Sequence, residues 1–154
     1  MSSIWSHVRG GCSVAVVAML AMLAGCASVP MASLESDSAA KQFQVAADKS
    51  RIYIYRNENM GGAIPMSLSV DGRMLGQSGP KTFFMVDVDP GSHTVSSHTE
   101  NVSTLTVDAK AGKAHYIWQE VKMGMWSARS QLQEVDAATG QAGVAECKLA
   151  QPAN

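Results

Sequence analysis

The chain has 154 residues, and its 12 Lys and Arg residues nearly balance its 13 Asp and Glu residues, so the formal net charge at pH 7 is −1. This length is enough for one domain of ordinary size after a short leader. A nucleic-acid ligand is not expected, because proteins that bind nucleic acids usually carry a clustered basic face.

The N-terminal residues have the pattern of a secretory signal. Arg9 precedes an apolar run over residues 12–23, which is twelve residues long. A helix that crosses the hydrocarbon core of a bilayer needs roughly 20 residues, so this run is too short to span it. We therefore predict that residues 1–25 form a leader that is removed by cleavage. An uncleaved signal anchor and an ordinary signal peptide cut near Ala27 are the alternatives.

A cysteine directly follows this leader. The sequence Leu23-Ala24-Gly25-Cys26 resembles the lipobox of bacterial lipoproteins, in which the cysteine receives lipid on its sulfur and becomes the new N-terminus. The resemblance implies acyl chains such as palmitate on Cys26, and hence the membrane as a partner. Each buried CH2 contributes about 0.8 kcal/mol, and stable anchoring takes more than one chain. Ala27, rather than Asp, follows the cysteine, which by resemblance to lipoprotein sorting favours the outer membrane, facing the periplasm.

Residues 26–48 combine small and polar side chains with Pro30 and several serines, which is typical of a tether between an anchor and a domain. Within this segment, residues 38–47 are rich in Ala and Gln and could form one or two helical turns. A helix this short is marginally stable on its own. We expect the folded domain over residues 49–150, followed by a tail at 151–154.

From Arg51 onward the hydrophobic pattern changes to a period of two residues. Ile52 and Ile54 alternate with Tyr53 and Tyr55, which is typical of a β-strand. The same kind of pattern recurs along the chain. It predicts strands over residues 52–55, 66–70, 84–88, 93–98, 103–108, 114–121, 129–135 and 144–149.

Turn residues separate the predicted strands. Asp71-Gly72 predicts a two-residue hairpin turn with positive φ at both positions, and Asp89-Pro90-Gly91 predicts a type II turn. Gly112 and Thr139-Gly140 mark two further reversals. Short strands at spacings of roughly 8 to 12 residues predict an all-β fold, a single antiparallel β-sandwich of about 7 to 8 strands. Because no alternation of strands with helices is visible, a parallel sheet is not expected.

Six short motifs follow one another along the chain: Ala40-Lys41-Gln42-Phe43, Ile52-Tyr53-Ile54-Tyr55-Arg56, Val70-Asp71-Gly72, Pro90-Gly91-Ser92-His93, Gly112-Lys113-Ala114-His115-Tyr116 and Leu132-Gln133-Glu134-Val135. Their order and spacing resemble a bacterial lipoprotein family that is described only as a domain of unknown function, with a prealbumin-like or carboxypeptidase-regulatory-like β-sandwich. The turns are also similar to those of PEGA-type modules. The resemblance implies a fold and a location in the envelope, but no reaction.

Aromatic and methionine side chains gather in one part of the sequence and form the candidate binding surface: Tyr116, Trp118, Met123, Met125 and Trp126. Aromatic rings can stack on sugars or on side chains of a partner, and methionine adapts to irregular apolar ligands. The alternative interpretation is that these residues fill the core of the sandwich.

A catalytic, cofactor or metal site is not expected, because no linear catalytic motif is present. His93 is expected to fix its turn by a hydrogen bond, and Asp89 to bind the backbone of the same turn. His93 and His98 lie on opposite faces of a continuous strand and cannot share a metal. Cys147 is expected to be a buried, inert thiol. Asp87 and His93 are the residues around which a hydrolase site could form.

The predicted function is therefore a membrane-anchored periplasmic lipoprotein that acts as a non-catalytic binding or assembly module of the cell envelope. Its candidate partners are an envelope protein or a glycan. One alternative is a carbohydrate- or peptidoglycan-binding module that uses Tyr116, Trp118 and Trp126. The other alternative is a hydrolase with a site around His93 and Asp87.

Overall fold

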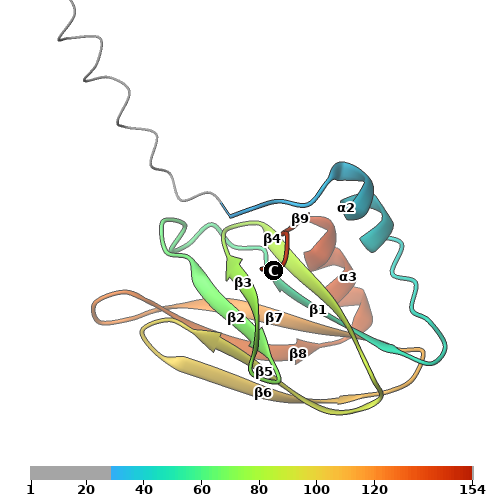
Figure 1. Cartoon of the computed structure of the whole chain (residues 1–154). Helices are drawn as coiled ribbons and strands as arrows, with labels where there is room; N and C mark the ends of the chain where they lie inside the picture. Colours follow the sequence, from blue (N-terminus) through green and yellow to red (C-terminus); the bar gives the residue numbers. More distant parts are fainter. Residues whose placement is uncertain (1–28, 154) are drawn as a thin grey trace, which may run out of the picture.

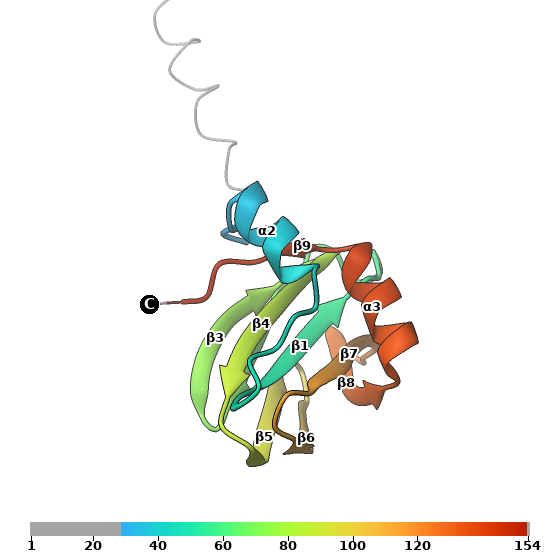
Figure 2. The ribbon, with the colours of Figure 1, turned by 90° about the vertical axis from the view of Figure 1, so that its right-hand side faces the viewer.

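The computed structural model describes residues 29–153, so Cys26 and the predicted leader lie outside the described residues. Two β-sheets pack face to face, and two helices lie beside one of them (Figures 1 and 2). The elements in chain order are α2 (Leu34–Ala40), β1 (Ser50–Arg56), β2 (Met66–Val70), β3 (Arg73–Ser78), β4 (Thr82–Val88), β5 (Gly91–His98), β6 (Val102–Ala109), β7 (Ala114–Met123), β8 (Ala128–Val135), α3 (Ala137–Ala145) and β9 (Lys148–Leu149).

The predicted all-β sandwich is confirmed. One sheet has the order β8-β7-β1-β4-β9, and the other has the order β3-β2-β5-β6. The four-stranded sheet is entirely antiparallel, whereas β1 pairs with β7, and β4 with β9, in parallel. These two parallel pairings were not expected. Both join strands far apart in the sequence, so no short hairpin imposes an antiparallel direction on them.

The main core lies between the two sheets, and β1 shows how the sequence builds it. Ile52 and Ile54 point into this core and are completely or almost completely buried. Their neighbours Tyr53 and Tyr55 point to the outer face of the five-stranded sheet, yet they are also buried. The central strand is therefore covered on both faces, because α2 and α3 form a third layer over the outer face of the sheet (Figure 2).

Helix α3 replaces part of a predicted strand and a predicted turn. Residues 144–149 were expected to be a strand, and Thr139-Gly140 a reversal, but only β9 is extended there. The two helical glycines explain the difference. A Cβ on Gly140 would lie 2.2 Å from the Tyr116 ring, and one on Gly143 would lie 2.2 Å from the Tyr55 ring. The glycines let α3 approach the tyrosine side chains closely, which a larger residue would prevent.

The predicted tether is part of the folded domain from Met31 onward, and its helix is α2 rather than residues 38–47. The Tyr53 hydroxyl donates a hydrogen bond to the Ala40 carbonyl at 2.8 Å. The Asp37 carboxylate accepts the Leu149 amide at 2.7 Å, at the C-terminal end of the domain. The segment packs on the outer tyrosines of the sheet and shields them from water. Local composition does not reveal this contact.

A chain of buried polar side chains connects the two sheets. The Ser78 hydroxyl donates to Gln119 Oε1 at 2.5 Å, and Gln119 Nε2 donates to Ser97 Oγ at 2.7 Å. Ser97 and Ser130 share a hydrogen bond of 2.7 Å. These side chains come from β3, β7, β5 and β8, so the chain of hydrogen bonds fixes how the two sheets lie on each other.

The turns confirm two local predictions. Asp71 and Gly72 have φ values of 51° and 78°, as the two-residue hairpin turn requires. His93 Nδ1 lies 2.6 Å from Asp71 Oδ2, and His93 Nε2 lies 2.7 Å from the Asp89 carbonyl oxygen. Both partners are acceptors, so both ring nitrogens donate only when His93 is protonated. The hydrogen bond with Asp71, followed by that with the Asp89 carbonyl, raises the pKa of His93.

This arrangement predicts a pH-dependent contribution to stability. Because the pKa of His93 is raised from its ordinary value of 6.5, the stabilisation is complete below that value and is lost as the pH rises through the folded-state pKa. Hydrogen bonds from His93 and from the Thr94 amide lower the pKa of Asp71 from its ordinary 3.8, so its stabilisation is present above that value and is lost as the pH falls through the folded-state pKa.

The substitution His93→Gln should therefore reduce the free energy of unfolding most between pH 3.8 and pH 6.5, the ordinary pKa values of Asp71 and His93. We expect a loss on the order of 0.5 kcal/mol, the usual size for a partly exposed ion pair. Thermal unfolding of both proteins at pH 5 and pH 9 measures the difference. The matched control is His98→Gln, since His98 is exposed at the other end of β5. An equal effect of His93→Gln at both pH values would contradict the proposed charge state.

Candidate binding surface at the β7–β8 turn

The structure separates the five residues of the predicted binding surface. Tyr116 is only 2% exposed and stacks on Tyr53, with ring centroids 5.2 Å apart, so it is a core residue. Trp118 is partly buried against the same outer cluster. Met123, Met125 and Trp126 are 84%, 80% and 88% exposed. The prediction is wrong for Tyr116 because α3 covers this part of β7.

The exposed side chains belong to the tight connection between β7 and β8. Met123 pairs with Ala128 at the end of the antiparallel ladder, and the chain reverses between them. A Cβ on Gly124 would lie 2.0 Å from the Ser127 carbonyl oxygen, so the reversal needs glycine at this position. The side chains of Met125 and Trp126 thus project from the turn into solvent and do not pack on the sheet.

A carboxylate from a neighbouring turn holds this connection in place. Glu100, between β5 and β6, accepts the backbone amides of Met125 at 3.2 Å, Trp126 at 3.0 Å and Ser127 at 2.8 Å. These hydrogen bonds, those from Ser127 and Trp126 most of all, lower the pKa of Glu100. The apolar side chains are therefore displayed from a backbone that is tied down by a charged acceptor.

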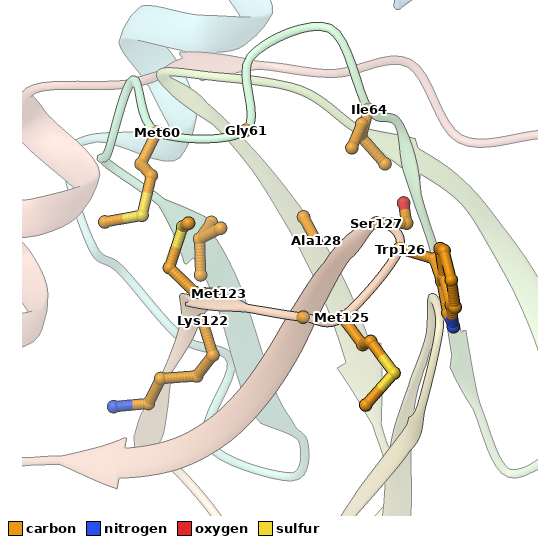
Figure 3. A pocket seen from close by; sticks show the side chains of 11 residues that line it. Met60, Gly61, Ile64, Lys122, Met123, Met125, Trp126, Ser127 and Ala128 are labelled. Carbon is orange, nitrogen blue, oxygen red and sulfur yellow. The ribbon is translucent and has the colours of Figure 1, made fainter.

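A groove runs between this turn and the loop that joins β1 to β2 (Figure 3). Its volume is about 280 Å³, and its walls are mostly apolar. In Figure 3, Met60 comes from the β1–β2 loop, whereas Met123, Met125 and Trp126 project from the β7–β8 turn. Met60 is 51% exposed. We call these four exposed side chains, Met60, Met123, Met125 and Trp126, the tip surface.

A buried arginine shapes the wall of the groove. Arg56, the last residue of β1, is fully buried and donates hydrogen bonds to the carbonyl oxygens of Met60, Gly61 and Ile64 at 2.8 to 3.0 Å. Within residues 29–153, no carboxylate forms an ion pair with it. Burial lowers the pKa of Arg56. The guanidinium thus gathers three carbonyl groups and fixes the path of the β1–β2 loop.

Sequence reasoning missed Met60, Glu100 and Arg56. A charged residue at an inward position of a strand was visible at Arg56, because it continues the alternation of Ile52 and Ile54. No comparable signal marked Glu100, which lies 25 residues before Met125. Contacts of this kind depend on the three-dimensional fold and leave no local pattern.

The residues considered for a hydrolase do not come together. Asp87 accepts two hydrogen bonds from Arg51, at 2.6 and 2.8 Å, and has no hydrogen bond with His93. The Asp89 carboxylate pairs with Lys49 at 2.7 Å, so the expected bond from this side chain to its own turn is wrong. No group of three or more His, Cys, Asp or Glu side chains within residues 29–153 could hold a metal ion.

Cys147 is a buried thiol, as predicted. It is 1% exposed, and burial raises its pKa to about 12. Its sulfur lies 3.5 Å from the Arg56 carbonyl oxygen, its acceptor at the end of β1. A thiol that ionises so reluctantly is a poor nucleophile at neutral pH. No helix in the described part of the chain combines the length and apolar character needed to cross a bilayer.

The role of Glu100 can be measured directly. The substitution Glu100→Ala removes the acceptor of three backbone amides, so these amides should exchange with solvent faster. Hydrogen exchange followed by NMR at Met125, Trp126 and Ser127 reports the change. Glu35→Ala is the matched control, because Glu35 lies in α2. Unchanged protection in Glu100→Ala would show that the turn is held by other interactions.

Comparisons with known proteins place the chain in a family without giving it a function. The model of a family described as "Protein of unknown function (DUF2846)" matches residues 46–131. An uncharacterized protein of Haemophilus influenzae is 31% identical over 137 residues, which is 88% of this chain and 82% of the relative. No solved structure matches. The family has no assigned function. These two matches show that the chain belongs to the DUF2846 family.

Proposed function

We propose that this protein is a membrane-anchored lipoprotein of the cell envelope, held by acyl chains on Cys26, that acts as a non-catalytic binding module through the tip surface. The observation that carries the binding role is the exposure of Met123, Met125 and Trp126, each at least 80% exposed on a turn held by Glu100. Exposed apolar side chains that gather in one place usually mark a contact with another surface.

The sequence around Cys26 supports the anchor. The apolar run over residues 12–23 is too short to span a bilayer, and small residues precede the cysteine. Ala27 after the cysteine supports the outer membrane, with the domain in the periplasm. If the leader is removed and Cys26 is acylated, Cys147 is the one thiol left in the chain, so the domain depends on no intramolecular disulfide.

The environments of the reactive side chains support a role without catalysis. Both ring nitrogens of His93 are engaged in hydrogen bonds, Asp87 is paired with Arg51, and the Cys147 thiol is buried. Each of these groups has a structural role that accounts for its position. A nucleophile with a neighbouring base, as hydrolysis requires, is not found around them.

A carbohydrate-binding role has less support. Stacking on a sugar needs a flat aromatic face that water can reach. Of the three aromatic residues proposed for this role, Tyr116 is in the core, Trp118 is partly buried, and only Trp126 is well exposed. The apolar turn, rather than an aromatic platform, is therefore the surface on which the proposed function rests.

The anchor is tested by growth with a labelled fatty acid and by mass spectrometry of the N-terminal peptide. We expect the label in the wild-type protein, a mature chain that begins at acylated Cys26, and no label in Cys26→Ser. Cys147→Ser is the matched control and should retain the label, because its thiol is buried on α3's C-terminal side. Unmodified Cys26 in native material, or label in Cys26→Ser, would refute the proposed anchor.

A further inference from the structure

We propose that the tip surface is a second point of contact with the bilayer that carries the anchor, with Met123, Met125 and Trp126 inserted at the lipid surface. This inference rests on the lipid anchor of the proposed function and names the occupant of its binding surface. It follows from the short distance between Cys26 and the folded domain, from the path of contacts that leads to the tip surface, and from the chemistry of its side chains.

The anchor leaves the domain little freedom to move away from the membrane. Two residues, Ala27 and Ser28, separate Cys26 from Val29. Even a fully extended chain covers only about 10 Å over these three steps. Val29 already packs against the domain, since a Cβ on Gly79 would lie 3.1 Å from its side chain. The surface around Gly79 must therefore stay close to the lipid headgroups.

A continuous path of contacts connects this surface with the tip surface. Pro80 follows Gly79, and its ring would lie 3.2 Å from a Cβ on Gly62. Gly62 belongs to the β1–β2 loop, whose Met60 and Gly61 form one wall of the groove. In Figure 1 this loop and the β7–β8 turn lie at the same end of the molecule. The β1–β2 loop thus connects the surface around Gly79 with the tip surface.

The exposed side chains suit a lipid surface. The tryptophan ring is amphipathic and favours the boundary between headgroups and acyl chains. Methionine is unbranched and flexible, so Met123 and Met125 can adapt to disordered lipid. The walls of the groove contribute only Lys122 and Ser127 as polar side chains, which is few for the hydroxyl groups of a sugar. A lipid surface asks for no such pattern of hydrogen bonds.

The charges around the turn balance one another. Lys122 and Arg129 lie opposite each other in the β7–β8 ladder. Lys122 pairs with Glu120 at 2.5 Å, and the charge of Arg129 lies close enough to Glu100 to lower its pKa. Attraction to anionic headgroups is therefore not the basis of the contact. Insertion should occur in zwitterionic phosphatidylcholine, which has no net charge, and should depend little on salt.

The two tryptophans of the mature chain provide a matched pair of probes. In Trp118→Phe, Trp126 is the tryptophan that remains after the leader is removed, and in Trp126→Phe it is Trp118. Phenylalanine at position 118 loses no hydrogen bond, because Trp118 Nε1 has no partner among the described residues. Circular dichroism checks that both variants keep the fold.

The acylated full-length mature protein is reconstituted into phosphatidylcholine vesicles with and without bromine on the acyl chains. Bromine quenches tryptophan only at short range. We expect brominated vesicles to quench the emission of Trp118→Phe, with the same loss in high salt, and to leave the emission of Trp126→Phe unchanged. Adding Met123→Ser and Met125→Ser to Trp118→Phe should weaken the quenching.

The outcomes separate the two proposals. If Cys26 is acylated and both variants float with the vesicles, but Trp126 is not quenched, the anchor stands and the second contact is refuted. The tip surface is then left to a protein or glycan partner. Equal quenching of Trp118 and Trp126 also refutes a contact specific to the tip surface. If mass spectrometry finds no acyl groups on Cys26, the proposed function and this inference both fail.

Discussion

Burial of β1 on both faces is the constraint on which the structure depends. Its isoleucines fill the space between the sheets, so Tyr53 and Tyr55 must face outward, where two large rings need a cover. Helices α2 and α3 provide it, and Gly140 and Gly143 allow the close approach of α3. The segments before β1 and after β8 are therefore as much a part of the domain as the strands.

The same strand links the core to the tip surface. After the two isoleucines, the next inward position of β1 is Arg56, which holds the carbonyl groups of the following loop. Glu100 performs the complementary task for the β7–β8 turn by accepting its amides. One buried cation and one surface anion thus define the two walls of the groove. Its apolar side chains can remain in water because the backbone beneath them does not depend on their packing.

The sequence predicted the features that are encoded locally. Alternation over β1 and the Asp71-Gly72 turn were sufficient to indicate strands and a hairpin, and β1, β2 and β4 to β8 include the predicted strands. Strand β3 was not predicted, and β9 covers only the end of the strand predicted over residues 144–149. Helix α3 was missed because glycine in isolation indicates a turn. Here the glycines leave room for tyrosine rings from another part of the chain. The parallel pairing of β1 with β7 likewise depends on which distant strands become neighbours in the sheet, and no local pattern shows this.

The candidate site was predicted only in part, because hydrophobicity does not distinguish a core side chain from an exposed one. Tyr116 and Trp126 have similar chemistry, and they differ in that α3 covers only the first. Glu100 and Met60 had no sequence signal, since each meets the β7–β8 turn through a loop distant in the chain. Those two side chains became visible only in three dimensions.

The exposure of the tip surface also makes it chemically vulnerable. Met123 and Met125 keep more than three quarters of their surface in contact with water, at 84% and 80%. An oxidant can therefore convert their thioethers to sulfoxides, which are polar and less able to enter an apolar environment. The buried Met66, which is 0% exposed, is shielded from the same reaction. Oxidative damage would thus make the tip surface more polar first and leave the folded sandwich beneath it intact.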